Sequence, residues 1–195
     1  MLTSKSPRRK NILEDRGYEF RIFPIEVSEI LNKNLNLSDQ ISDCAHQKVK
    51  AAIEDPNLPK SQDYLLLGAD TVVVHNSQVL GKPKNEQDAF NILNQLSGQV
   101  HDVITGFCLF DLTTKRLILD HDITSVKFKT LSEKVIHDYI QTGEPMDKAG
   151  SYGIQGQGKE FVESFDGSFL NVVGLPIEKI EKVIERNGWQ LKRKS

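Results

Sequence analysis

The sequence predicts a single α/β domain, residues 1–195, with a mixed, partly antiparallel sheet arranged as two lobes around a central cleft. Three observations lead to this prediction. Helical and strand patterns alternate along the chain without internal repeats. Two long strand-like segments, 99–112 and 116–131, are separated only by Thr113-Thr114-Lys115, which predicts an antiparallel hairpin. No linker rich in Gly, Pro or Ser divides the chain into separate domains.

The first part of the chain predicts helix, strand and helix. Ser6 is suited to cap a helix that starts at Pro7 and ends near Gly17, because a serine side chain accepts a hydrogen bond from a free backbone N–H and proline fits the first helical position. Residues 18–23 read as a strand. Apolar residues at helical spacing then predict an amphipathic helix over 39–54, with Ser38 as its cap.

The middle of the chain predicts a buried strand and another helix. Residues 55–63 form a loop by their Pro, Asn and Asp content. The apolar run that follows predicts a strand ending near residue 74, a turn at 75–77 and a short strand ending at Gly81. Residues 86–96 carry apolar residues on one helical face, which predicts a helix before the long hairpin.

The last part of the chain predicts two helices that enclose a glycine-rich loop. Ser132 caps a helix over 133–142, and Gly143 ends it. The loop 144–161 is followed by a pair of strands that turn at Asp166 and Gly167. A helix over 177–187 completes the pattern.

Composition excludes several classes of protein. The net charge of −2 argues against binding of nucleic acid, which needs a broad basic face. Cys44 and Cys108 form no CxxC pair, so the sequence predicts neither a disulfide framework nor a zinc site. No apolar run reaches the ~18 residues that span a bilayer, and no signal core follows the N-terminus. These features indicate a protein of the cytoplasm that does not bind membranes.

The start of the first helix carries three cations, Arg8, Arg9 and Lys10, where the helix dipole favours anions. One interpretation is that these side chains serve solubility. The other is that an anion docks there, because helix N-termini attract phosphate and guanidinium groups add bidentate donors.

A carboxylate and a lysine stand out in apolar surroundings. Asp70 interrupts a run that should be buried, so it either bonds nearby backbone groups or has a catalytic or metal-binding role. Lys48 lies on the apolar face of its helix and needs a carboxylate or a bound anion as partner, unless its ammonium group reaches the surface.

Weaker signals come from Lys82 and Gln155. Lys82 lies between a glycine and a proline, and a surface lysine is its ordinary explanation. Gln155 lies among four glycines, which permit close approach of the backbone to a ligand, and its amide suits the edge of a base. A flexible surface loop has the same composition.

Several known motifs for phosphate or acyl chemistry are absent from the sequence, namely the P-loop, the dinucleotide-binding GxGxxG turn and the GxSxG elbow. Three His-Asp dipeptides, at 101–102, 121–122 and 137–138, suggest a metal phosphohydrolase that holds its ligands on helices. Because the first two lie in predicted strands, where neighbouring side chains face opposite ways, this alternative is not favoured.

Taken together, seven stretches in order resemble the Maf family of nucleotide pyrophosphatases. They are SKSPRR, the A-x-x-K of residues 45–48, GADTVV, LGKP, LSGQVHDVITG, GEPMDKAGSYGIQG and NVVGLP. The resemblance implies a bilobed α/β fold and hydrolysis of a nucleoside triphosphate between the α and β phosphates with a divalent metal, Mg or Mn. It also implies a homodimer.

The resemblance further implies a set of site residues. Asp70 becomes the catalytic acid or base and, together with Glu29, a metal ligand. The implied substrate-binding residues are Ser6, Arg8, Arg9, Lys48, Thr71, Lys82 and Gln155. The combination of Thr71 and Gln155 is similar to the branch that acts on dTTP and UTP, in which Arg8 is also associated with substrate choice. Gln155 can donate to O4 and accept from N3–H of uracil or thymine.

Two other functions stay open at this point, a 7-methyl-GTP pyrophosphatase and a non-catalytic nucleotide sensor in the control of cell division. The sequence also departs from the family pattern in three places. The strand before the first helix is cut to residues 1–3, Ser151 replaces a usual alanine, and Leu170 stands at a position that is often aromatic or polar. The first departure predicts a frayed sheet edge and a weaker hold on Arg8 and Arg9.

Overall fold

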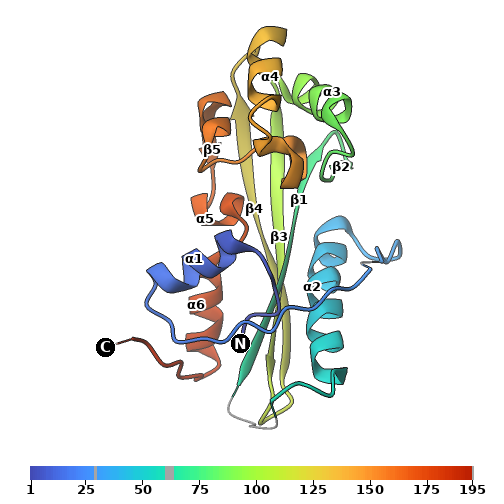
Figure 1. Ribbon diagram of the computed structural model, residues 1–195. Coiled ribbons are helices and arrows are strands. Elements are labelled where there is room, and N and C mark those ends of the chain that lie inside the picture. Colours follow the sequence, from blue (N-terminus) through green and yellow to red (C-terminus); the bar gives the residue numbers. More distant parts are fainter. Residues whose placement is uncertain (29, 60–63, 195) are drawn as a thin grey trace. The chain divides into compact units, whose positions relative to one another are not determined.

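The computed structural model describes residues 1–28, 30–59 and 64–194 and confirms a mixed α/β fold (Figure 1). The strands are β1 (Leu65–His75), β2 (Gln78–Leu80), β3 (Val100–Asp111), β4 (Leu117–Phe128) and β5 (Val162–Asp166). The α-helices are α1 (Pro7–Asp15), α2 (Leu37–Glu54), α3 (Glu86–Leu96), α4 (Glu133–Ile140), α5 (Phe169–Val173) and α6 (Ile177–Arg186). Short 3₁₀ turns cover Glu144–Asp147, Ala149–Ser151 and Gln157–Phe161.

A five-stranded sheet in the order β2-β1-β3-β4-β5 organises these elements. The outer strands are antiparallel to their neighbours, with β2 on β1 and β5 on β4. The residues between β3 and β4 form the predicted hairpin turn, closed by a 3.0 Å bond from the N–H of Asp111 to the carbonyl of Arg116. Leu2 adds parallel bridges to Ile22 and Leu67, so the sheet is mixed as predicted.

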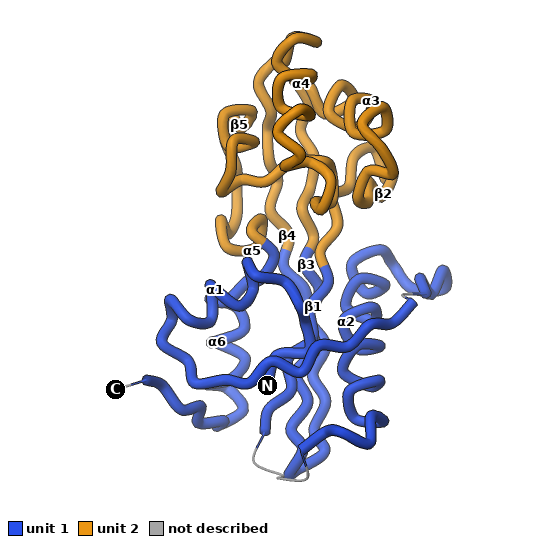
Figure 2. Tube along the Cα trace, viewed as in Figure 1, with its two compact units in different colours: residues 1–70, 105–122, 174–195 blue, residues 71–104, 123–173 orange. Residues whose placement is uncertain are grey.

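The chain forms two compact units, each built from separate segments (Figure 2). Unit 1 comprises residues 1–70, 105–122 and 174–195, and unit 2 comprises residues 71–104 and 123–173. The boundary cuts through β1 between Asp70 and Thr71, and it also falls within β3 and β4. The single domain and its cleft stay predictions.

In unit 1, two strand glycines bring α2 close to the sheet. A methyl group at Gly106 of β3 would lie 2.4 Å from the backbone nitrogen of Ser42, and one at Gly68 of β1 would lie 2.5 Å from the carbonyl oxygen of Ala45. Both distances are too short for any side chain. Figure 1 shows α2 on one side of these strands and α1 and α6 on the other.

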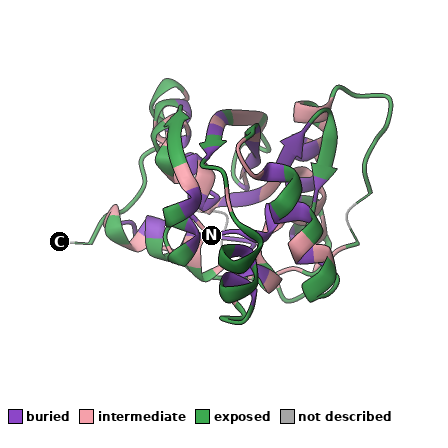
Figure 3. Ribbon diagram, turned by 90° about the horizontal axis from the view of Figure 1, so that it is seen from above, coloured by how far each residue is buried: buried purple, intermediate pink, exposed green. Residues whose placement is uncertain are grey.

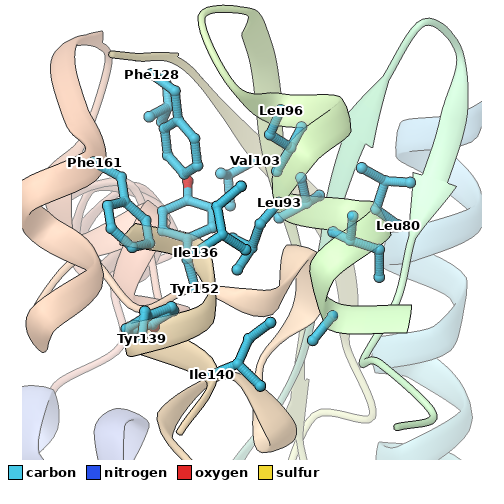
Figure 4. Packing of buried hydrophobic residues seen from close by; sticks show 14 residues of the cluster. Leu80, Leu93, Leu96, Val103, Phe128, Ile136, Tyr139, Ile140, Tyr152 and Phe161 are labelled. Atoms are coloured by element: carbon cyan, nitrogen blue, oxygen red, sulfur yellow. The ribbon is translucent and has the colours of Figure 1, made fainter. Parts of the chain in front are cut away.

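Unit 2 has its own core, between α3, α4 and the strands (Figure 4). Four rings form its aromatic part, and they pack edge to face: Phe128 with Tyr152 and Phe161, and Phe161 with Tyr139, with ring centroids 4.7 to 5.9 Å apart. This geometry adds to the free energy gained from burying the rings.

The helices carry both buried and exposed residues, as expected for elements that cover a sheet (Figure 3). Among the helices in the described ranges, none combines the length and the apolar character needed to cross a membrane.

Local capping signals predicted two of the helix starts correctly. The side chain of Ser6 accepts a bond from the N–H of Arg9, with Pro7 in the first turn, and the side chain of Ser132 accepts one from Val135. The cap of α2 was predicted wrongly. Asn36, not Ser38, accepts the bond from the N–H of Asp39, so α2 begins two residues earlier than predicted.

Two predicted strand elements are also wrong. Residues 18–23 form no continuous strand, because they pair only through isolated bridges to two different segments, Tyr18 with Arg193 and Ile22 with Leu2. The turn at Asp166 and Gly167 does not lead into a second strand, because the chain instead enters α5. Gly167 has a φ of 125°, which lets the chain turn away from β4 into that helix.

Candidate active site

Lys48 and Asp70 form a shielded ion pair in unit 1. The Nζ atom of Lys48 donates to Oδ1 of Asp70 at 2.8 Å and to the carbonyl oxygen of Ala69 at 3.1 Å. The two side chains are only 12% and 16% exposed, respectively. A carboxylate and an ammonium group at this depth attract each other strongly, because little water screens their charges. Of the alternatives that the sequence left open for Lys48, the structure shows the carboxylate partner.

The close packing of α2 sets the position of this pair. Lys48 follows Ala45 on the helix by one turn, and Ala45 is the residue whose carbonyl approaches Gly68. Gly68 in turn lies two residues before Asp70 on β1. The same GADTVV segment thus supplies both the carboxylate and the glycine that admits the helix carrying its lysine.

Arg9 is held from two sides within unit 1. It is 8% exposed, its Nε atom donates to the carbonyl oxygen of Gly174 at 2.8 Å, and its Nη1 atom donates to Oγ of Ser4 at 3.1 Å. The oxygen of Ser4 also accepts a bond from the N–H of Ser6 at 3.2 Å. A guanidinium bound in this way has a fixed orientation, which reduces the entropy lost on binding an anion.

The short N-terminal segment is anchored, and the expected frayed edge is not observed. Leu2 is fully buried, and the N–H of Thr3 donates to the carbonyl oxygen of Leu67 at 2.9 Å. The hydroxyl of Thr3 donates to the same oxygen at 3.2 Å. Ser4 follows directly, so the contacts of residues 2 and 3 place the hydroxyl that holds Arg9.

Unit 1 contains five of the predicted site residues, and unit 2 contains three. Those of unit 1 are Ser6, Arg8, Arg9, Lys48 and Asp70, and those of unit 2 are Thr71, Lys82 and Gln155. Arg8 is half-buried in the first turn of α1 and has interactions within the protein. Glu29 lies outside the described residues.

In unit 2, the segment that carries Lys82 joins the glycine-rich loop. The N–H of Gly150 donates to the carbonyl oxygen of Gly81 at 3.1 Å. Gly150 has a φ of 67°, and a methyl group there would lie 2.6 Å from the side chain of Val73. Glycine is therefore required at this position for both its backbone angle and its close approach. Lys82 itself is exposed.

Glu144 organises the loop that carries Gln155, although no sequence pattern indicated this role. Its carboxylate accepts bonds from the hydroxyl of Tyr139 at 3.0 Å and from the N–H groups of Gln157 at 2.9 Å and Gly158 at 3.4 Å. A methyl group at Gly156 would lie 2.1 Å from Oε1 of Glu144. In an irregular loop these N–H groups have no carbonyl partner from a helix or sheet, and the carboxylate accepts their hydrogen bonds instead.

A groove of about 790 Å³ opens beside Gln155, entirely within unit 2. Its walls include Ile154, Gln155, Val162, Phe165 and Phe169. The sequence signal for the groove was incomplete, because only Gln155 was singled out and the two aromatic residues come from β5 and α5.

The described residues contain no cluster of three or more His, Cys, Asp or Glu side chains able to hold a metal ion by themselves. Asp70 nevertheless fits a magnesium site of the common kind, in which one or two carboxylates bind the ion together with phosphate oxygens and water. Such a site is completed by the substrate.

The fold and these motifs define a class of protein. The family profile described as Maf-like protein matches residues 1–187, so the chain belongs to the Maf family.

Three relatives are similar over nearly the whole chain, and each is named dTTP/UTP pyrophosphatase. The protein of Bdellovibrio bacteriovorus is 47% identical over 186 residues, which cover 95% of this chain and 97% of that protein. The protein of Alkaliphilus oremlandii is 42% identical over 187 residues, covering 96% and 95%, respectively. The protein of Clostridioides difficile is 41% identical over 186 residues, covering 95% and 93%.

Proposed function

We propose that the chain hydrolyses dTTP and UTP between the α and β phosphates, giving the nucleoside monophosphate and pyrophosphate. The observation that carries the proposal is the shielded ion pair in which Nζ of Lys48 lies 2.8 Å from Oδ1 of Asp70. Both residues lie within the part of the chain that matches the Maf family. Similarity over nearly the full length to proteins named dTTP/UTP pyrophosphatase supports the choice of substrate.

Asp70 acts as the general base. Its carboxylate takes a proton from water, and the resulting hydroxide oxygen bonds to phosphorus while the bond to the bridging oxygen breaks in line. The bond from Lys48 fixes the orientation of the carboxylate.

Arg8, Arg9, Lys48 and Lys82 neutralise the triphosphate. Negative charge on the phosphate oxygens shifts toward the leaving group as the bond breaks, so cations that are already oriented stabilise the transition state more than the ground state. Arg9 meets this requirement best, because Gly174 and Ser4 fix its guanidinium. Ser6 contributes by capping the helix that begins with these arginines.

Asp70 and Glu29 would hold a divalent cation, Mg²⁺ or Mn²⁺, together with the phosphates. When bound, the cation supplies charge neutralisation and polarises the phosphoryl oxygens. Because Asp70 also contacts Lys48, we expect the described part of the site to bind metal weakly without substrate.

Thr71 and Gln155 contribute to the choice of a pyrimidine, with Arg8. The Gln155 side chain is exposed, and its amide can donate to O4 and accept from N3–H of uracil or thymine. The corresponding edge of cytosine has the opposite pattern, with a donor at position 4 and an acceptor at position 3, so a fixed amide would select against it.

A nucleotide panel with Mg²⁺ or Mn²⁺ tests the proposal. We expect pyrophosphate and monophosphate from dTTP and UTP, with much slower turnover of CTP and purine nucleotides. Release of orthophosphate would instead indicate a phosphatase, and preferential turnover of 7-methyl-GTP would place the chain in the other branch of the family. Binding of nucleotides without turnover would indicate a sensor.

A further inference from the structure

The groove in unit 2 exposes two aromatic rings side by side. Phe165 on β5 is 43% exposed and Phe169 on α5 is 40% exposed. Their ring centroids lie 6.1 Å apart, with the planes inclined by 49°. Exposure of two adjacent aromatic side chains has a free-energy cost that burial against another flat apolar group would remove.

The segment that carries Phe169 is fixed on the sheet of unit 2. The side-chain amide of Asn171 donates to the carbonyl oxygen of Val103 and to Oγ1 of Thr124, both at 3.0 Å. A methyl group at Gly167 would lie 2.7 Å from that same Oγ1. The bonds of the buried Asn171 amide and the close approach of Gly167 to Thr124 fix the backbone of α5. They therefore also fix the position from which the Phe169 side chain extends.

Gln155 forms the polar side of the groove. Its side chain has no hydrogen bond to any residue in the ranges that the structure describes. The backbone next to it is held, because the N–H of Gln157 donates to the carboxylate of Glu144 at 2.9 Å. A held loop with an available amide is suited to recognise a ligand edge that carries one acceptor and one donor.

We infer that this groove binds the pyrimidine base of the nucleotide, with Phe165 and Phe169 packing against the ring and Gln155 bonding to its edge. The inference rests on the proposed function and adds two residues that contact the base. A volume of about 790 Å³ has room for a nucleoside, and aromatic walls with a single available amide match a ligand that is flat, apolar on its faces and polar at one edge.

A second copy of the chain is the rival occupant, because β5 is an outer strand of the sheet and outer strands can pair with other chains. The base is favoured because Lys159 and Glu163 also line the groove, and such charged side chains oppose edge-to-edge pairing.

Binding of products without turnover tests the inference. The affinities of dTMP and of 2-deoxyribose 5-phosphate, which lacks the base, are measured by calorimetry for the wild type, Phe169→Ala, Phe169→Trp and Phe165→Ala. In the wild type we expect dTMP to bind more tightly than the baseless sugar phosphate. The alanine variants should bind dTMP about tenfold more weakly, which is typical of a lost base–aromatic stack, and should bind the sugar phosphate unchanged.

Two controls separate stacking from folding. Phe169→Trp keeps a flat ring and should keep the affinity for dTMP. Val135→Ala changes an exposed apolar residue of α4, 43% exposed, outside the groove and should change neither affinity. Equal affinities of the wild type for dTMP and the sugar phosphate, or equal losses for both ligands in the alanine variants, would overturn the inference.

The proposed function can fail separately. If the wild type binds dTMP through its base but releases no pyrophosphate from dTTP, the base site stands and the pyrophosphatase proposal falls. If dTTP is hydrolysed but the phenylalanine variants bind dTMP as the wild type does, only the base site falls. Sedimentation of the wild type and of Phe165→Ala tests whether a second copy occupies the groove. If the wild type is a dimer, Phe165→Ala is a monomer and the affinity for dTMP is unchanged, the groove binds a second copy and not the base.

Discussion

Asp70 is the residue on which the proposed chemistry depends most. Asp70→Asn keeps the size of the side chain and an oxygen that can accept the bond from Lys48, but the amide is not a base. We expect kcat for dTTP to fall by about 10²- to 10⁴-fold, the usual contribution of a positioned general base. Assays of pyrophosphate release, quenched at successive times, measure kcat.

A surface variant with the same chemistry is the control for Asp70→Asn. Asp138 pairs with Lys134 on α4 and is 65% exposed, so Asp138→Asn should leave kcat within twofold. Wild-type turnover by Asp70→Asn, with an unchanged circular dichroism spectrum, would rule out the role given to Asp70.

Ser151 has a hydroxyl group that the fold does not use. The residue is fully buried, and its Oγ atom has no hydrogen-bond partner within the described ranges. Ser151→Ala should therefore raise the free energy of unfolding by about 1 kcal/mol, because a buried polar group without a partner is destabilising. Urea denaturation measures the change.

Ser132→Ala is the matched control, and its change in the free energy of unfolding should have the opposite sign to that of Ser151→Ala. Its hydroxyl accepts the capping bond from the N–H of Val135, so its loss should lower the free energy of unfolding by about 1 kcal/mol. A Ser151→Ala variant that is destabilised to the same extent would mean that the hydroxyl is bonded in solution.

The packing of α2 on the sheet makes Gly106 sensitive to substitution. In Gly106→Ala the new methyl group meets backbone atoms of Ile41 and Ser42, which cannot move without shifting the helix. We expect a loss of at least about 2 kcal/mol in the free energy of unfolding, as for other overpacked cores. Gly81→Ala, whose methyl group would meet no atom within 4 Å, is the control and should change stability little.

The glycine-rich loop depends on the charge of Glu144. Glu144→Gln keeps the shape of the side chain but weakens the bonds from Tyr139, Gln157 and Gly158. If the loop positions Gln155 for the base, the variant should raise KM for dTTP several-fold and leave kcat nearly unchanged. Steady-state kinetics with dTTP and CTP give the measurement. A fall in kcat alone would point to a different role.

The elements that the sequence predicted well are those with local signals. Helix α3 and the hairpin of β3 and β4 follow from apolar periodicity and short turns. The segments predicted wrongly depend on distant partners. Residues 18–23 had a strand pattern but find only isolated bridges, to Leu2 and to Arg193. The segment after Gly167 forms α5, where Asn171 bonds to β3 and β4.

The candidate site was predictable only in part, for the same reason. Lys48 and Asp70 each stood out as charges in apolar surroundings, so a partner could be expected for both. Glu144 and Phe169 had no such signal, because a glutamate in a polar loop and an aromatic residue near a turn are ordinary. Their roles come from contacts with Gln157 and Phe165 that only the fold reveals.

The stability of the whole molecule should depend on pH through His101. Burial lowers the pKa of this histidine from 6.5 to about 4, with a smaller contribution from His75. The unfolded chain therefore takes up a proton between pH 6.5 and 4 that the folded chain does not. Stability is fully present above pH 6.5 and falls as the pH drops through this window, by about 2–3 kcal/mol between pH 7 and 4.5.

Urea denaturation at pH 7, 5.5 and 4.5 isolates this contribution. His101→Gln lacks the titrating group, so its free energy of unfolding should fall less steeply with acid than that of the wild type. His137→Gln, at an exposed position on α4, should retain the wild-type slope. Parallel slopes for the wild type and His101→Gln would show that other groups cause the acid sensitivity.

The segmented construction of unit 1 has a consequence for biosynthesis. Leu175, Ile177 and Ile180 are essentially fully buried in unit 1, although they are translated only after residues 123–173 of unit 2. Gly174, which holds Arg9, belongs to the same segment. While the ribosome still encloses these residues, unit 1 lacks part of its core, so a nascent chain cannot acquire the arranged Arg9 until residues 174–180 have emerged.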